Sequence, residues 1–385
     1  MFKFGIMDLI LIMGSCHCSA SNEISSIKVL QNNARKVDRH LTLAEQISKL
    51  NFPNLPQKIL DREINEIKLE QGSFMITKKM ITIEGAPSGL QIPYEEKLVQ
   101  VDGTETQANI LQKLKMWVSC KKGLKTDPNQ DDFVVIVDDY NFLIGVFDGH
   151  GIFGHYISDF VHKELPKLLF EHPCWQDSPE KVLKESFVKC HSNLIRFSNQ
   201  KNSNFDCNMS GTTSTVVFKR QDRLFVAHVG DSRVIIGRKT DDGVIPVVLT
   251  QDHKPDLEKE KERIEAAGGE VRKMPGGPSR VYLKGKEYPG ISMTRAIGDL
   301  VSQGIGIVSA PDTREFLLTE DDLFIIMASD GVWEFIPDEE AVRVASTSTD
   351  AKEAASRLTA LAWTKWISIE ENVVDDITVI ITYLV

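Results

Sequence analysis

Short apolar runs that end in an aspartate, or begin just after one, constrain the fold of this chain most strongly. Runs of this length are typical of buried strands. In an antiparallel sheet, aspartates that leave one strand and enter its neighbour lie at the same edge. The aspartates placed in this way are Asp148, Asp231, Asp330, Asp375 and Asp376. Carboxylates gathered at one edge suit Mg²⁺ or Mn²⁺ better than zinc, because these hard cations prefer oxygen ligands.

Length and charge exclude some classes of protein. At 385 residues the chain has room for two domains, or for one large domain with an extension. A formal net charge of −10 argues against a nucleic-acid partner, which needs a basic surface. The six cysteines are scattered without a Cys-x-x-Cys pair, so we expect reduced thiols rather than disulfides or a zinc knuckle. Because the sequence has no repeat or heptad pattern, we expect a monomer.

The leader, residues 1–20, allows several interpretations. Its apolar stretch resembles a weak signal peptide but is short and interrupted by a charged residue, so no transmembrane segment is predicted. If translation began at Met13, Gly14 would be placed for myristoylation, with Cys16 and Cys18 placed for palmitoylation. An unstructured leader is the alternative. We therefore expect a cytoplasmic protein, which associates with membranes through its acyl chains if Met13 is the start.

The remaining chain divides near residue 116. Residues 21–115 carry no metal-like cluster, and both a regulatory arm and a packed extension remain open for them. Residues 116–385 predict short strands joined by hairpins, with helices inserted in pairs. The predicted strands cover residues 133–137, 142–147, 212–218, 224–229, 234–237, 323–329 and 377–383. The predicted helices cover residues 157–170, 179–198, 257–267, 338–346 and 351–366. This order favours an α+β fold of antiparallel sheets flanked by helices.

The densest chemical motif is Asp148-Gly149-His150-Gly151. The carboxylate of Asp148 can bridge two cations, and Gly149 has no side chain to keep a metal from its carbonyl oxygen. His150 can move a proton near neutral pH. Alone, the motif is explained equally well by a tight turn.

Eight motifs follow one another in a fixed order. They are Asn-Gln-Asp-Asp (129–132), Asp-Gly-His-Gly (148–151), Ser-Gly-Thr-Thr (210–213), Gly-Asp-Ser-Arg (230–233), Asp-His-Lys-Pro (252–255), Ser-Met-Thr-Arg-Ala-Ile-Gly-Asp (292–299), Ala-Ser-Asp-Gly (328–331) and Val-Asp-Asp-Ile-Thr-Val-Ile (374–380). Together they closely resemble the metal-dependent type-2C protein serine/threonine phosphatases. The resemblance covers residues 116–385, the predicted catalytic domain.

The resemblance implies a four-layer αββα fold, a β-sandwich of two antiparallel sheets flanked by helices, with metals in a cleft at one edge. It implies that Asp148 bridges the metals, that Gly149 adds a carbonyl ligand, and that His150 is the general acid. The other ligands that it implies are Asp131, Asp231, Asp299 and Asp375, with Asp231 beside a third, weaker metal. Asp330 and Asp376 are left with supporting roles.

The implied reaction uses two Mg²⁺ or Mn²⁺ ions to neutralise a phosphomonoester and to activate water for in-line attack. A general acid then protonates the departing serine or threonine oxygen. Phosphoproteins are the expected substrates. Two alternatives remain open: a pseudophosphatase that binds phosphoproteins without hydrolysing them, and a membrane-tethered enzyme whose extension controls access to the cleft.

The first motif departs from the family pattern. Gln130 stands where many relatives carry an acidic residue, so we expect weaker metal affinity. Lysines stand where some relatives use an arginine to hold phosphate, which removes a bidentate contact. Lys122 and Lys125 are the candidates for phosphate binding, and a solvated basic turn is the alternative interpretation.

Other motif residues are expected to support the site. His253 is predicted to be structural. Arg233 and Arg295 are predicted to hold carboxylates or carbonyls in place rather than to touch substrate. Residues 269–289, rich in glycine, proline and lysine, resemble the family's variable flap beside the active site.

Overall fold

The computed structural model describes residues 80–86, 96–97, 99–102, 111–125, 127–138, 141–273 and 277–384. The leader, the acylation motif and most of the predicted 21–115 extension lie outside these residues, so acylation and cellular location stay predictions. Within the described ranges, no helix is long and apolar enough to cross a membrane.

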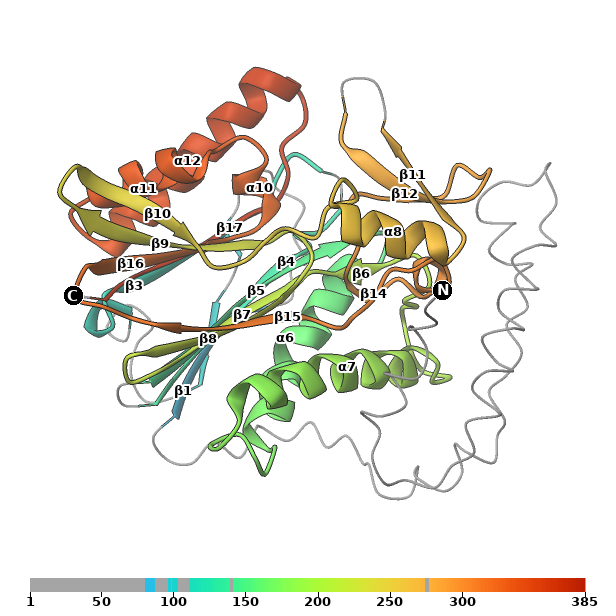
Figure 1. Ribbon diagram of the computed structural model, residues 1–385, viewed down its shortest axis with the longest axis horizontal. Coiled ribbons are helices and arrows are strands. Elements are labelled where there is room, and N and C mark those ends of the chain that lie inside the picture. The colour runs from blue at the N-terminus through green and yellow to red at the C-terminus, as the bar shows by residue number, and fades with distance from the viewer. Residues whose placement is uncertain are drawn as a thin grey trace, which may run out of the picture. The chain divides into compact units, whose positions relative to one another are not determined.

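Two antiparallel β-sheets form the centre of the fold, and helices cover their outer faces (Figure 1). The larger sheet has nine strands. In chain order these are β1 (Met80–Gly85), β2 (Val99–Asp102), β4 (Asp131–Asp138), β5 (Asn141–His150), β6 (Gly211–Thr212), β7 (Ser214–Arg220), β8 (Arg223–Val229), β14 (Ile297–Gly298) and β15 (Asp312–Leu317). Their spatial order is β15-β8-β7-β5-β4-β1-β2, and β6 joins β5 to β14.

The second sheet has five strands. In spatial order these are β10 (Gly243–Val248), β9 (Arg233–Thr240), β16 (Asp322–Ala328), β17 (Ile377–Tyr383) and β3 (Met116–Lys121). A separate three-stranded sheet contains β11 (Gly269–Lys273), β12 (Ser279–Leu283) and β13 (Pro289–Ile291).

Helices lie on both outer faces of the two central sheets (Figure 1). Those on the nine-stranded sheet are α6 (Gly154–Phe170) and α7 (Pro179–Ser198). Those on the five-stranded sheet are α10 (Asp330–Trp333), α11 (Asp338–Ser346) and α12 (Ala351–Glu370). Among the described residues, the remaining helices are α8 (Glu258–Ala266), which packs on β11, and the single turn α9 (Leu300–Gln303).

Apolar side chains alternate along the central strands, so both sheets bury both of their faces. In β4, Val135 belongs to the apolar layer between the sheets, whereas Val134 belongs to the layer under α6 and α7. On the far side, Phe324 of β16 packs with residues of α11 and α12. Three apolar layers therefore separate four structural layers, which confirms the predicted αββα sandwich and the α+β class.

The predicted helices correspond to α6, α7, α8, α11 and α12, and their ends differ by at most four residues. The predicted hairpins also form, since β4 pairs with β5 and β7 pairs with β8. The structure adds strands that the sequence analysis did not identify, chiefly the edge strands β2, β10 and β15. The flap-like stretch 269–289 contains β11 and β12 of the three-stranded sheet, and this sheet packs on α8 through Ile264, Val281 and Ile291.

The nine-stranded sheet begins upstream of residue 116, where the catalytic domain was predicted to start. β1 pairs with β4, with Ile83 opposite Val135, and also pairs with β2. The side chain of Ile83 is fully buried between the two sheets. Part of the predicted extension is therefore an integral part of the sandwich.

Truncating Ile83 tests whether β1 contributes to the stability of the domain. We expect Ile83→Ala to lower the free energy of unfolding by about 2–5 kcal/mol, because it leaves a cavity between packed sheets. Ile245→Ala on β10 is the control, since Ile245 is 46% exposed. Chemical denaturation of both variants measures the difference, and equal small losses would contradict this role of β1.

Candidate metal centre and active site

The β4–β5 hairpin brings the first two acidic residues together. Asp131 at the start of β4 lies directly opposite Asp148 near the end of β5. The backbone of Asp148 is fixed by Thr213, because Asp148 N donates to Thr213 Oγ1 (3.0 Å) and Thr213 N donates to Asp148 O (2.8 Å). The Asp131 carboxylate is buried and accepts a hydrogen bond of 2.7 Å from the hydroxyl of Ser329, which directly follows β16 of the other sheet. At this edge of the sandwich, which we call its open end, hydrogen bonds thus fix the backbone that carries the carboxylates.

Further carboxylates reach this end from other strands. Asp330 follows β16, Asp375 precedes β17, and Asp231 lies in the turn between β8 and β9. Side-chain oxygens of Asp148, Asp231 and Asp330 all lie within 4.8 Å of one another. Both sheets therefore contribute to one acidic cluster, as the strand-end pattern predicts.

Mutual repulsion and burial make these carboxylates hard to ionise. Burial and the charges of Asp330 and Asp131 raise the pKa of Asp148 well above its ordinary value. Burial and Asp375 raise the pKa of Asp330 to about 7, and burial and Asp376 raise the pKa of Asp131 to about 8. Such a cluster is stable in its charged form only when cations offset the repulsion.

Two lysines supply part of the compensating charge. Lys254 Nζ forms an ion pair with Asp231 Oδ2, and Lys125 Nζ forms one with Asp375 Oδ1. Nothing in the local sequence pattern indicates the first pair, because its partners are separated by 23 residues. The other oxygen of Asp231, Oδ1, is buried and has no hydrogen-bond partner among the described residues.

The donor set fits a divalent metal. Clustered carboxylate oxygens, one of them buried and unpaired, are the ligands that Mg²⁺ and Mn²⁺ prefer. Gly149 must lack a side chain for a further reason, since a Cβ there would lie 2.5 Å from Gly154 O and 2.6 Å from Gln130 O. The role of its carbonyl as a metal ligand stays a prediction.

His150 is paired with Asp299. His150 Nε2 lies 2.6 Å from Asp299 Oδ2. Burial by itself lowers the pKa of His150, but the negative charge and hydrogen bond of Asp299 outweigh it and leave the pKa raised. Gly211 makes room for the pair, because a Cβ there would overlap the Asp299 carboxylate and lie 2.9 Å from His150 Nε2.

The structure places Asp299 and Asp330 in surroundings that differ from the roles implied for them. The resemblance implies that Asp299 binds metal and that Asp330 only supports the site. Instead, Asp330 lies in the cluster with Asp148 and Asp231, and Asp299 engages His150. Both aspartates follow short strand segments, so local sequence pattern does not distinguish them; only the spatial arrangement of the strands does.

Asp376 and Lys122 have structural roles. Asp376 accepts hydrogen bonds from Gly123 N and Gln130 N, each 2.8 Å long, which agrees with its predicted supporting role. Lys122 is only 1% exposed, and its ammonium donates to backbone carbonyls of Gly123 and Lys125. The prediction that Lys122 binds phosphate is therefore wrong. Lys125 is more accessible, at 36% side-chain exposure.

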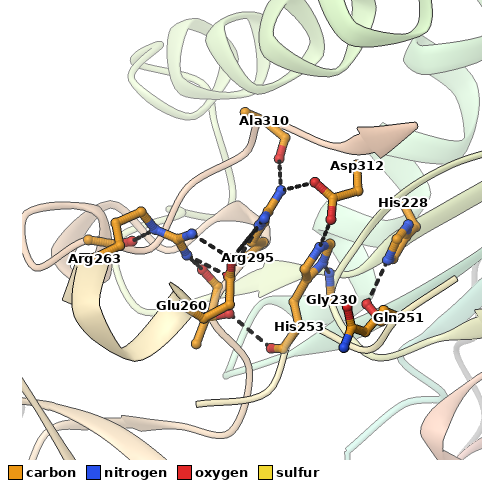
Figure 2. A network of polar contacts seen from close by, with 11 residues as sticks. His228, Gly230, Gln251, His253, Glu260, Arg263, Arg295, Ala310 and Asp312 are labelled. Atoms are coloured by element: carbon orange, nitrogen blue, oxygen red, sulfur yellow. Dashed lines mark hydrogen bonds and ion pairs between the residues drawn. The ribbon is translucent and has the colours of Figure 1, made fainter. Parts of the chain in front are cut away.

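Arg295 and His253 hold the segments around the cluster, as predicted (Figure 2). Arg295 Nη2 lies 2.7 Å from Glu260 Oε1, and Arg295 Nη1 lies 2.7 Å from Asp312 Oδ1. Asp312 Oδ2 in turn lies 3.3 Å from His253 Nε2. His253 Nδ1 accepts a hydrogen bond of 3.1 Å from Gly230 N. Gly230 directly precedes Asp231 of the acidic cluster. This network connects α8 to the β8–β9 turn.

Arg233 has a similar role at the other side of the turn. It forms a two-pronged ion pair with Asp252, with distances of 2.9 and 2.7 Å, and lies 2.7 Å from Asp338. The guanidinium also lies over the ring of Trp333. As predicted, Arg233 holds carboxylates in place.

Asp330→Asn tests whether Asp330 belongs to the metal centre. Without metal, we expect the variant to unfold at a higher temperature than the wild type, because one repelling charge is removed. With Mn²⁺, we expect an affinity about tenfold to hundredfold lower by isothermal titration calorimetry. Asp127→Asn, at an exposed position, is the matched control. Equal Mn²⁺ affinity in both variants would contradict the assignment.

Comparison with known proteins agrees with this geometry. Residues 128–366 match the family model described as Protein phosphatase 2C. The chain is 31% identical over 262 residues to "Probable protein phosphatase 2C 35" of Arabidopsis thaliana, covering 63% of this chain and 73% of that protein. It is 35% identical over 254 residues to "Probable protein phosphatase 2C 72" of the same plant, covering 63% and 76% respectively.

Solved structures share the fold. The described architecture is similar to a crystal structure of a serine-threonine phosphatase 2C from Toxoplasma gondii, with a TM-score of 0.62. That match has 21% sequence identity and covers 78% of this chain and 98% of the other. Because the family model spans more than half of the chain and agrees with the motifs and the sandwich, this chain belongs to the protein phosphatase 2C family.

Proposed function

We propose that this chain carries out its family's reaction at the cluster of Asp148, Asp231 and Asp330. Family membership makes the chain a metal-dependent protein serine/threonine phosphatase, with phosphoproteins as substrates. The observation that carries the site assignment is the convergence of these carboxylates from both sheets onto one point. A protein that only bound phosphate, an anion, would gain nothing from such a concentration of negative charge.

The proposed cofactors are two Mg²⁺ or Mn²⁺ ions, with a third bound more weakly beside Asp231. The residues that would hold them are Asp131, Asp148, Gly149 through its carbonyl, Asp231, Asp330 and Asp375. When bound, the cations offset the charge of the phosphomonoester and activate a water molecule. The unpaired Oδ1 of Asp231 and the raised pKa of Asp148 support this assignment.

His150 is proposed as the general acid. As the bond between phosphorus and the serine or threonine oxygen breaks, the imidazolium would give its proton to that oxygen. Asp299 engages Nε2, so Nδ1, which has no hydrogen-bond partner among the described residues, is the nitrogen left to donate. Asp299 would therefore orient the ring and keep it protonated.

Lys125 is the remaining candidate for contact with phosphate. Its ammonium is partly exposed and is already held at the cluster by Asp375. A lysine offers phosphate a single point charge, without the two parallel hydrogen bonds of an arginine. We therefore propose that phosphate is held mainly by the cations and only secondarily by this side chain.

Metal removal tests the proposed activity. We expect turnover of a phosphothreonine peptide with Mn²⁺, loss of turnover with a chelator, and recovery when Mn²⁺ is restored. Asp148→Asn should lower kcat by about a hundredfold or more, because a bridging carboxylate is lost. Asp127→Asn serves as the control. Full turnover with chelator present, or phosphopeptide binding without turnover at saturating Mn²⁺, would refute the proposal.

The pairing of His150 with Asp299 predicts a pH effect. The raised pKa keeps His150 protonated to higher pH, and this acid is lost as the pH rises through that value. Asp299→Asn removes the charge that raises the pKa, so the alkaline limb of the kcat profile should move to lower pH. Asp241→Asn, at an exposed position in the β9–β10 turn, is the control. An unchanged profile in Asp299→Asn would exclude this role.

A further inference from the structure

A buried lysine from outside the family match lies under the first metal motif. Lys97 has a side-chain exposure of only 2%. Its backbone N–H donates to Cys120 O at 2.7 Å, which fixes the segment beside β3. Its ammonium lies 2.7 Å from Asp131 O and 3.0 Å from Asp132 Oδ2. A buried ammonium is stable only with partners of this kind, so these contacts define where Lys97 lies.

Asp132 is the centre of a buried network of charges. Its Oδ2 lies 3.0 Å from Lys97 Nζ and 3.0 Å from His162 Nδ1, and its Oδ1 accepts a hydrogen bond from Phe133 N. The other ring nitrogen of His162 lies 3.7 Å from Glu84 Oε2. The side chains of Asp132 and His162 are fully buried. Burial by itself lowers the pKa of His162, but the charge and hydrogen bond of Asp132 raise it to about 9, so His162 is cationic near neutral pH. Two anions and two cationic groups thus balance one another beneath α6.

The end of strand β1 packs closely against this network. Glu84 and Gly85 are its last two residues. A Cβ at Gly85 would overlap Asp132 Oδ1 and lie 3.1 Å from Lys97 Cδ, so the close packing requires glycine there. Residues upstream of the family match at 128 therefore complete the surroundings of Asp132.

The same region does not suit a further cation. Ligand atoms of Asp132, Asp159 and His162 lie within 4.8 Å of one another. However, Lys97 and His162 already place positive charge against Asp132 Oδ2. A metal would have to displace the ammonium, so the cluster is better explained as a self-compensated ion-pair network.

The buried ion-pair network contacts the proposed metal centre through the backbone carbonyl of Asp131. Lys97 binds the carbonyl of Asp131, while Ser158 of α6 donates to Gln130 O at 2.6 Å. On the other side, Asp376 accepts from Gln130 N. The start of β4 is therefore held from α6, from the upstream segment and from the turn before β17.

We propose that Lys97 is a positioning residue for the metal centre: by holding the Asp131 carbonyl, it fixes the carboxylate of Asp131 for metal binding. The inference rests on the proposed metal centre. It assigns part of the upstream segment a role in metal affinity, in addition to its role in packing.

Lys97→Met in the full chain is the first test. Methionine keeps most of the apolar stem but removes the ammonium. We expect the Mn²⁺ dissociation constant, measured by isothermal titration calorimetry after chelator treatment, to rise about tenfold to hundredfold. Lys184→Met is the control, because Lys184 lies at the surface of α7, where it pairs with Glu180, and should bind Mn²⁺ like the wild type.

A charge-balanced double variant separates positioning from loss of stability. Lys97→Met with Asp132→Asn removes both the ammonium and the carboxylate it neutralises, so the unfolding temperature should recover toward that of the wild type. Mn²⁺ affinity should stay low, because the Asp131 carbonyl still lacks its donor. Recovery of both quantities, or wild-type affinity in Lys97→Met, would overturn the proposal.

Asp148→Asn distinguishes failure of this inference from failure of the metal centre. If Asp148→Asn weakens Mn²⁺ binding while the Lys97 variants do not, only the positioning role is refuted. If Asp148→Asn binds Mn²⁺ like the wild type, the metal-centre assignment fails, and the inference about Lys97 fails with it.

Discussion

Repulsion among carboxylates at the open end of the sandwich is the constraint on which the rest of the site depends. Asp148, Asp231 and Asp330 bring side-chain oxygens within 4.8 Å of one another in a largely buried setting. Without cations, their charges are costly, as the raised pKa values of Asp148 and Asp330 indicate. A fold that retains such a cluster needs rigid strands and turns to hold it together, and it needs divalent cations to stabilise it.

The buried carboxylates of two neighbouring residues of β4 are stabilised in different ways. Because side chains alternate along a strand, Asp131 points toward the second sheet and Asp132 points toward α6. Asp132 is neutralised by Lys97 and His162 and has no need of a metal. The carboxylate of Asp131 accepts a hydroxyl hydrogen bond from Ser329, and burial and Asp376 raise its pKa to about 8. One residue stabilises the fold, while the other remains available for a cation.

The local sequence pattern predicted antiparallel sheets flanked by helices and an acidic edge, because strand periodicity and strand-end residues are local signals. The two-sheet sandwich was implied by the family resemblance. Partners far apart in the sequence were not predictable in this way. The pairing of His150 with Asp299 spans 149 residues, and Lys97 reaches Asp131 from 34 residues upstream. The motifs identified Asp299 and Asp330 as site residues, but the surroundings of each depend on which strands lie side by side. The place of β1 in the central sheet was not predictable in this way either, because β1 pairs with β4, which lies far downstream in the sequence.

Anomalous diffraction from crystals grown with Mn²⁺ tests the central claim most directly. Data collected at the manganese absorption edge locate each ion independently of the protein density. We expect anomalous peaks in contact with the carboxylate of Asp148, between the two sheets, and none between Asp132 and His162. A peak in the buried network under α6, or no peak beside Asp148, would contradict the account.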